Sequence, residues 1–315
     1  MGKRVGKFPT VPGAKSHMDK TVSFLRPEHL APIRSLSLRA KSIVEGTIAG
    51  IHKSPYHGFS AEFLEYRKYQ CGEDSRKIDW RKFAKTGKSV VRLFEDETNL
   101  FATVLIDKSG SMGFSQGSSI SKFEYARTLA ASLAWILIRQ RDAVGLCAFD
   151  SAQSLYLPPK STNAQLNAIL KHLDAMESSG ETRCGDCVER MAMGMSRRGM
   201  CIIVSDFFDD PAEIIRGLRH LRFKRQDVLA LWLLDPMEAT FSPQQSCEMI
   251  DMETNATMTL DKRTAGEYFF ATMASHRRII EDACAGMHIA LEMIVTDEPF
   301  AKALIRILHK RRRLS

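Results

Sequence analysis

The stretch FATVLIDKSGS, residues 101–111, decides the fold. Residues 101–106 form a nearly apolar run, which predicts a strand. Asp107 follows this run, and Lys108–Ser111 supply the polar and small residues of a tight loop. A helical pattern then extends over residues 121–140. The order strand, loop and long helix is typical of a parallel sheet with helices on its faces.

The same order repeats along the rest of the chain. Apolar runs that are continuous rather than alternating, such as residues 200–204, are typical of strands covered on both sides. We therefore expect an α/β fold with a doubly wound, mainly parallel sheet, as in Rossmann-like domains. The expected strands are residues 101–106, 143–149, 200–205, 228–234 and 289–295, and the expected helices are residues 121–140, 163–176, 184–198, 211–221 and 263–285.

The residues before position 100 follow a different pattern. Residues 24–51 place Leu and Ile at helical spacing between polar residues, which predicts a helix. Residues 59–67 and 88–95 are predicted as strands, separated by the polar residues 71–87. The expected divisions are a flexible basic leader at residues 1–23, an N-terminal helix and β-hairpin extension at 24–99, the main domain at 100–298 and a C-terminal basic helix at 299–315.

The composition is that of a soluble globular protein. Of 315 residues, 44% are hydrophobic and 26% are charged, which excludes a disordered polymer and a disulfide-rich miniprotein. The longest nearly apolar run, residues 129–138, is far shorter than the roughly 20 residues that a spanning helix needs. The first residues lack the apolar segment of a secretory signal. We therefore expect a cytoplasmic protein with no membrane span, whose seven cysteines are reduced.

The charge balance permits an acidic partner without specifying one. Lys and Arg outnumber Asp and Glu by 45 to 37, so the net charge is +8. Much of the excess lies at the two ends, within residues 3–20 and 310–313. Because no aromatic residues for stacking are interleaved there, we interpret both ends as solvated tails rather than as a nucleic-acid site.

Two of the expected strands are followed directly by an aspartate, Asp107 and Asp206. In doubly wound folds, ligands bind beyond the carboxyl ends of the strands. The loop after Asp107 adds the hydroxyls of Ser109 and Ser111. Carboxylates and hydroxyls without imidazole or thiol form a hard-oxygen set, which suits Mg²⁺ or Mn²⁺ rather than zinc. The alternative interpretation is that these aspartates cap helices and the serines make turn hydrogen bonds.

This set resembles the metal-ion-dependent adhesion site of von Willebrand factor A domains. In that pattern, Asp-x-Ser-x-Ser is joined by a threonine and an aspartate from later loops. The resemblance implies that the serines and the threonine contact the metal directly or through water, and that the aspartates act mainly through water. One coordination position would be left for an acidic side chain of a partner. The matching residues here are Asp107, Ser109, Ser111, Thr182 and Asp206.

One position departs from the pattern. Glu181 precedes Thr182, where a small residue is expected. Its carboxylate could add a ligand or repel an acidic partner. The third loop therefore has two candidate ligands, Thr182 and Glu181.

A segment before the main domain also carries a resemblance. Residues 65–81, EYRKYQCGEDSRKIDWR, continuing to VRLFE at 91–95, resemble the hallmark of a bacterial and archaeal family catalogued as domain of unknown function fifty-eight. Members of that family are typically encoded beside MoxR-type AAA+ ATPases, which implies such an ATPase as a partner. Basic and acidic residues alternate around Trp80, and we interpret this as a charge-paired hairpin clamped against the core.

Other patterns favour no enzyme class. Cys184 and Cys187 form a Cys-x-x-Cys at an expected helix start, but no preceding strand supports a redox motif and no second cysteine pair completes a zinc site. No nucleophile elbow, phosphate-binding loop or dinucleotide fingerprint occurs. We therefore expect no enzyme and no small-molecule substrate.

Two function classes remain. The first is a metal-ion-dependent protein-interaction module, an adaptor or cochaperone that works with a MoxR-type AAA+ ATPase or binds an acidic protein client. The second is a metal-assisted hydrolase that uses the same carboxylates to activate water.

Overall fold

The computed structural model divides the chain into two compact units. One unit contains residues 1–50 and 100–315, and the other contains residues 51–99. The expected leader at residues 1–23 lies outside the described part of the chain. The structure describes residues 26–52, 63–69, 80–94, 100–150, 153–180, 184–195, 197–240, 247–250, 257–260 and 262–314.

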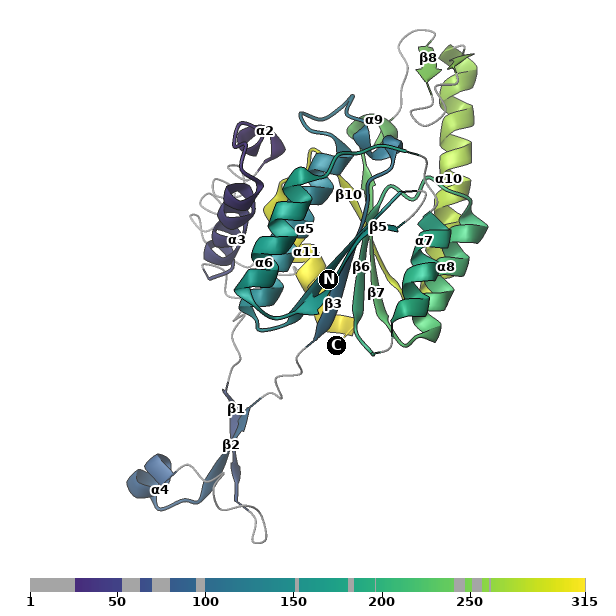
Figure 1. Cartoon of the computed structure of the whole chain (residues 1–315). Coiled ribbons are helices and arrows are strands. Elements are labelled where there is room, and N and C mark those ends of the chain that lie inside the picture. The colour runs from purple at the N-terminus through teal and green to yellow at the C-terminus, as the bar shows by residue number, and fades with distance from the viewer. Residues whose placement is uncertain are drawn as a thin grey trace, which may run out of the picture. The chain divides into compact units, whose positions relative to one another are not determined.

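The larger unit is built around a six-stranded sheet (Figure 1). All neighbouring strands are parallel except the last pair, in which β5 runs antiparallel to β4. The expected α/β fold with a mainly parallel sheet is confirmed. The strand order is β10 (Ala290–Val295), β7 (Asp227–Leu234), β6 (Met200–Ser205), β3 (Phe101–Asp107), β4 (Ala143–Phe149) and β5 (Gln153–Lys160).

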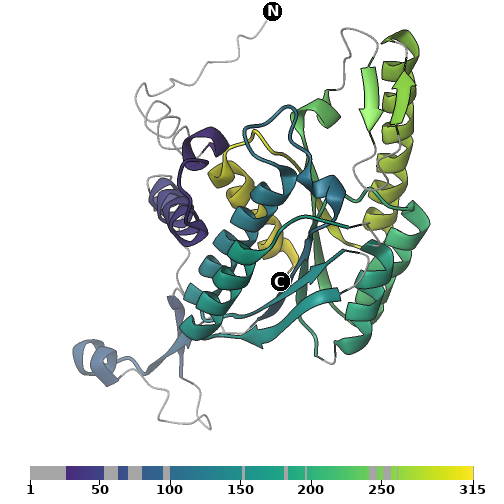
Figure 2. The same cartoon turned by 45° about the horizontal axis from the view of Figure 1, so that its top comes forward.

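Helices cover both faces of this sheet (Figures 1 and 2). The first face carries α5 (Lys122–Arg139), α6 (Asn163–Ala175) and α11 (Phe300–Leu314), and the second carries α7 (Cys184–Gly194), α8 (Pro211–Phe223) and α10 (Lys262–Gly286). Short helices η2 (Gly110–Gly113) and α9 (Pro236–Ala239) follow β3 and β7.

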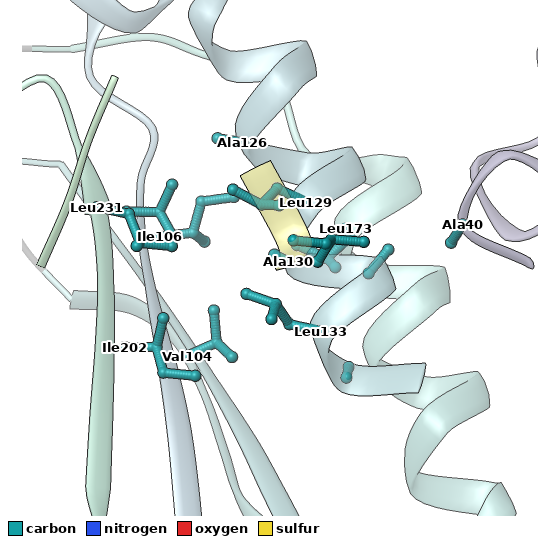
Figure 3. Close-up of a cluster of buried hydrophobic side chains, with 14 of the residues drawn as sticks. Ala40, Val104, Ile106, Ala126, Leu129, Ala130, Leu133, Leu173, Ile202 and Leu231 are labelled. Carbon is teal, nitrogen blue, oxygen red and sulfur yellow. The ribbon is translucent and has the colours of Figure 1, made fainter. Parts of the chain in front are cut away.

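The sheet separates two buried clusters because successive side chains of a strand point to opposite faces. Along β3, Val104 and Ile106 belong to the cluster under α5, whereas Leu105 belongs to the cluster under α7 and α8. Figure 3 shows the first cluster, where side chains of the strands face Leu129 and Leu133 of α5.

The structure divides the N-terminal region differently from our expectation. Helix α2 (Pro27–Leu30) and all but the last two residues of α3 (Leu36–His52) belong to the larger unit rather than to a common extension with the hairpin. Ala40 and Ile43 of α3 are fully buried in the cluster that also contains α5 and α6. The apolar face of α3 is thus part of the main core.

The C-terminal basic helix is also part of the main core, so the expected boundary at residue 298 does not separate it. Phe300, Leu304 and Ile307 are buried in the first cluster. Two of the basic residues that we interpreted as a solvated tail are paired, Lys310 with Glu292 and Arg311 with Asp142. Earlier in the same helix, Arg306 pairs with Glu292 and Glu298.

The smaller unit contains the expected hairpin, in which β1 (Phe63–Lys68) pairs antiparallel with β2 (Val90–Phe94). Between them lies α4 (Trp80–Thr86), a helix that we did not predict. Trp80 is 57% exposed, so its indole is not buried in a core. The interpretation of the hairpin as charge-paired and clamped against the core stays a prediction. In the larger unit, β8 (Cys247–Ile250) and β9 (Thr257–Leu260) form a further antiparallel pair.

Candidate metal site at the carboxyl end of the sheet

The chain changes direction in the sheet between β3 and β6. From β3 the connection through α5 leads to β4 on one side, and from β6 the connection through α8 leads to β7 on the other. Asp107 ends β3 and Asp206 follows β6, and both are fully buried. The two aspartates therefore lie at the switch point of the sheet, where doubly wound folds bind ligands.

Hydrogen bonds fix the carboxylate of Asp107 at both oxygens. The backbone N–H of Ser109 donates to Oδ1 at 2.9 Å, and the hydroxyl of Ser205 donates to Oδ2 at 2.6 Å. The Oγ atoms of Ser109 and Ser111 lie 3.1 Å apart. Sequence reasoning missed Ser205, although its place as the last residue of a buried strand directly before Asp206 was a usable signal.

The two carboxylates repel each other in a buried environment. Burial first, and then repulsion from Asp206, raise the pKa of Asp107 to about 7, although hydrogen bonds from Ser205 and Ser109 act in the opposite direction. A nearby positive charge would oppose this repulsion.

Lys122 supplies one such charge, which sequence reasoning did not find. Its Nζ donates to Oδ2 of Asp206 at 2.7 Å and to Oε1 of Glu238 at 2.6 Å, and the side chain is fully buried. Burial lowers the pKa of Lys122, but attraction to Asp206 and Glu238 outweighs it, so the net pKa lies above its ordinary value. A usable signal was its place in the first turn of α5, where the helix dipole disfavours a cation.

Aromatic rings surround the Lys122 ammonium. Nζ lies 4.7 Å from the ring centroid of Phe208 and 5.7 Å from that of Phe114. Rings at these distances attract a cation and exclude water from it. The charge of Lys122 is thus held in place at the candidate site.

A chain of hydrogen bonds continues from Lys122 to the end of β7. Glu238 accepts from Lys122 through Oε1 and from the backbone N–H of Asp235 through Oε2, the latter at 2.8 Å. Asp235, which caps α9, accepts from the backbone N–H of Gly117 at 2.9 Å. These contacts join α9 and the loop before α5 to the aspartates at the switch point.

The segment that leads to Thr182 packs on the loop after β3. The N–H of Gly110 donates to the carbonyl of Gly180 at 2.8 Å, and the N–H of Ser179 donates to the carbonyl of Lys108 at 2.7 Å. Thr182 and Glu181, the candidate ligands of the third loop, lie outside the described residues.

The donor chemistry fits a hard divalent cation. Two carboxylates and two hydroxyls meet at this end of the sheet, and such oxygens suit Mg²⁺ or Mn²⁺. Within the described part of the chain, no group of three or more His, Cys, Asp or Glu side chains could hold a metal ion. A cation at this position would therefore depend on the hydroxyls of Ser109 and Ser111 and on water.

The Cys-x-x-Cys motif has a packing role. Burial raises the pKa of both Cys184 and Cys187, which disfavours the reactive thiolate. A Cβ atom on Gly185 would lie 2.4 Å from the backbone carbonyl of Glu213. The small residues at this helix start allow α7 and α8 to approach closely.

Comparison with family models gives one match over this region. Residues 65–279 match the model described as "Protein of unknown function DUF58", which includes the hairpin and most of the sheet. The chain belongs to this family. The resemblance of residues 65–95 to the family hallmark is thereby confirmed.

Similar proteins include a mycobacterial relative and two solved structures. "Uncharacterized protein Rv1480" of Mycobacterium tuberculosis is 25% identical over 292 residues, which cover 91% of this chain and 91% of its own length. The conserved hypothetical protein BatB from Bacteroides thetaiotaomicron has a TM-score of 0.45 at 15% identity and covers 67% of this chain and 98% of its own. The SpRpn10 VWA domain has a TM-score of 0.40 at 13% identity and covers 65% and 94%.

Among the described residues, no helix combines the length and the apolar character that crossing a bilayer requires.

Proposed function

We propose that this protein is a metal-ion-dependent interaction module that binds an acidic side chain of a protein partner. The observation that carries the proposal is the convergence of Asp107, Ser109, Ser111 and Asp206 at the switch point of the sheet. These oxygens lie where doubly wound folds bind ligands, and their chemistry is that of a magnesium site.

The four side chains would contribute to metal binding in two ways. The hydroxyls of Ser109 and Ser111 would bind Mg²⁺ or Mn²⁺, and Asp107 and Asp206 would act through bound water. The ion would supply an electrophilic position for a carboxylate of the partner. Because both oxygens of Asp107 already accept hydrogen bonds from protein groups, its carboxylate is oriented before an ion binds.

The partner that we propose is a MoxR-type AAA+ ATPase or an acidic client delivered to it. This choice rests on what the family resemblance implies, because members of the family are typically encoded beside such ATPases. The match of residues 65–279 to the family supports the resemblance. A carboxylate that completes the shell of the ion would be held by a charge-assisted contact, so loss of the metal should mainly accelerate dissociation.

Metal binding can be measured by calorimetry with Mg²⁺ and Mn²⁺ on the wild type, Asp107→Ala and Ser109→Ala. We expect binding to the wild type and at least about tenfold weaker binding to both variants, because each loses a contact to the ion or its water. Asp174→Ala, which removes an exposed carboxylate of α6, is the matched control. Equal binding by all four proteins would refute the site.

Partner binding can be measured by pull-down of a MoxR-type AAA+ ATPase from the same organism, in Mg²⁺ and in EDTA. The proposal predicts that capture is lost in EDTA and in Asp107→Ala. If neither EDTA nor Asp107→Ala reduces capture, the partner docks elsewhere.

A second candidate function is metal-assisted hydrolysis. The observation that favours it is the pair of buried carboxylates, Asp107 and Asp206, at the switch point, which could orient a metal-bound water. Turnover of phosphate or carboxylate esters that depends on Mg²⁺ and on Asp107 would support this function. Metal-dependent capture of a partner without turnover would favour the interaction module.

A further inference from the structure

Helix α4 of the smaller unit exposes a pair of aromatic side chains. Trp80 is 57% exposed and Phe83 is 39% exposed, and their ring centroids lie 5.9 Å apart at an interplanar angle of 83°. Residues three apart share one side of a helix, and the exposed Ala84 extends this side. The helix therefore presents an apolar strip to solvent.

The end of this helix is well defined. The hydroxyl of Thr86 donates to the carbonyl of Lys82 at 2.8 Å, and the N–H of Gly87 donates to the carbonyl of Phe83 at 2.8 Å. Gly87 has a φ of +66°, the left-handed conformation that often ends a helix. These contacts fix the short helix and thereby the positions of both rings.

Basic residues lie in and after helix α4, between the acidic residues Asp79 and Glu95. From Trp80 to Phe94 the sequence contains five basic residues and no acidic residue. Lys85 and Lys88, near the end of the helix, are exposed. The combination of exposed aromatic rings and flanking lysines is typical of a helix that lies in the interface of an anionic membrane.

We propose that the α4 surface, defined by Trp80, Phe83, Lys85 and Lys88, binds reversibly to a membrane that contains anionic lipids. The two rings would enter the headgroup region, where Trp is favoured, and the lysines would stay at the level of the lipid phosphates. The surface lies outside the unit that contains the candidate metal site, so the proposal does not rest on the proposed function.

The geometry favours a membrane over a nucleic acid. Base stacking needs open ring faces along a basic groove, whereas Trp80 and Phe83 pack edge to face on a short helix. A protein partner would need a pocket that encloses Trp80 and acidic residues opposite the lysines.

The experiment uses the full chain with phosphatidylcholine vesicles that contain phosphatidylglycerol, and with vesicles of phosphatidylcholine alone. Trp80 is a usable probe, because the other two tryptophans are shielded: Trp232 is fully buried and Trp135 is half-buried. We expect sedimentation with the anionic vesicles, a blue shift of the tryptophan emission, and loss of both in high salt. Trp80→Phe should keep most of the binding and lose the shift.

Variants separate the aromatic and the charged contributions. Trp80→Ser combined with Phe83→Ser should abolish sedimentation, and Lys85→Glu combined with Lys88→Glu should weaken it by at least about tenfold. The controls are Phe223→Ser, an 80% exposed aromatic of the other unit, and Lys160→Glu combined with Lys171→Glu, two exposed lysines there.

Circular dichroism verifies that each variant folds. Binding that is equal in all variants, or absent from anionic vesicles in the wild type, would overturn the proposal. Tighter binding to a single-stranded oligonucleotide than to vesicles would also overturn it and would favour a nucleic-acid surface.

Discussion

Lys122 is a single residue that joins two sets of contacts. Its ammonium neutralises Asp206 at the switch point and holds Glu238, which in turn bonds to the backbone of Asp235. The positive charge therefore partly fulfils the role that a metal ion would have toward Asp206. We infer that the site keeps its shape without a divalent ion.

Replacing Lys122 with Met should reveal both roles. Asp206 and Glu238 would be left as buried charges without a counter-ion, so we expect a loss of roughly 3–5 kcal/mol of unfolding free energy. Mg²⁺ should restore part of this loss, so its stabilising effect on the melting temperature should be larger than in the wild type. Thermal unfolding with and without Mg²⁺ measures both effects. Lys171→Met, at an exposed position, should change neither, and an equal Mg²⁺ effect in all three proteins would contradict this role for Lys122.

The sequence indicated part of the candidate site at this scale. Asp107, Ser109, Ser111 and Asp206 could be predicted because a local pattern of apolar run, aspartate and hydroxyls marks the ends of strands. Lys122 and Ser205 gave only positional signals, the first turn of a helix and the end of a buried strand, which do not specify their roles. Their roles depend on burial and on partners far away in the sequence, such as Glu238.

Helices α7 and α8, on one face of the sheet, approach each other closely at two glycines. A Cβ on Gly217 would lie 2.7 Å from the carbonyl of Gly185, and a Cβ on Gly185 would lie 2.4 Å from that of Glu213. Both distances are too short for a real contact, so α7 and α8 pack backbone to backbone. The Cys-x-x-Cys motif contains the first of these glycines.

Gly185→Ala should therefore destabilise the protein by about 1–3 kcal/mol, because the helices must separate to admit the methyl group. Gly194→Ala is the matched control on the same helix, where a Cβ would meet no atom within 4 Å. It should be neutral or stabilise by about 0.5 kcal/mol through helix propensity. Chemical denaturation compares the two, and equal stabilities would show that α7 and α8 can separate at no cost.

The ion pairs that bind α11 to β10 should make the free energy of unfolding decrease at acid pH. Burial raises the pKa of Glu292, but hydrogen bonds from Lys310 and Arg306 outweigh it, so the folded pKa lies below the ordinary 4.5. The stabilising contribution is then complete above pH 4.5 and is lost as the pH falls through the folded pKa.

Glu292→Gln should lower stability at neutral pH and reduce the further loss on acidification. Urea unfolding at several pH values measures this. A variant that loses as much stability in acid as the wild type would show that other carboxylates control the acid transition.

Helices and strands could be predicted from the sequence where their own residues form a clear local pattern. Strands β3, β4, β6 and β7 are apolar runs, and their bounds agree closely with expectation. Strand β5 was missed because Pro158 and Pro159 interrupt its pattern. The sequence predicted a helix at α11 but did not predict that this helix is buried. The acidic residues that pair with its basic residues lie outside the helix, in β10 and shortly after α5.

At the scale of the whole molecule, the two units differ in how they are stabilised. The two large buried clusters contain residues of the larger unit alone among the described residues, including α3 and α11. None of the described side chains of the hairpin unit at residues 51–99 belongs to these clusters. Folding of the larger unit should therefore not require the hairpin.

Deletion of residues 51–99, with a flexible glycine and serine linker in their place, tests this independence. We expect a cooperative thermal transition close to that of the full chain, and unchanged binding of Mg²⁺ in calorimetry. Removal of α11 at residues 300–314 is the opposite case and should abolish folding, because Phe300, Leu304 and Ile307 belong to the core. A shortened protein without a cooperative transition would mean that the hairpin is needed for the fold.

The two prolines of β5 restrict how a partner can approach. Proline has no N–H, so Pro158 and Pro159 interrupt the row of donors that an edge strand offers to an incoming strand. Gln165 also donates to the carbonyl of Pro158 at 2.9 Å, which occupies an acceptor of this strand. A partner peptide therefore cannot extend the sheet at β5 by a regular ladder, and recognition there must use side chains rather than strand pairing.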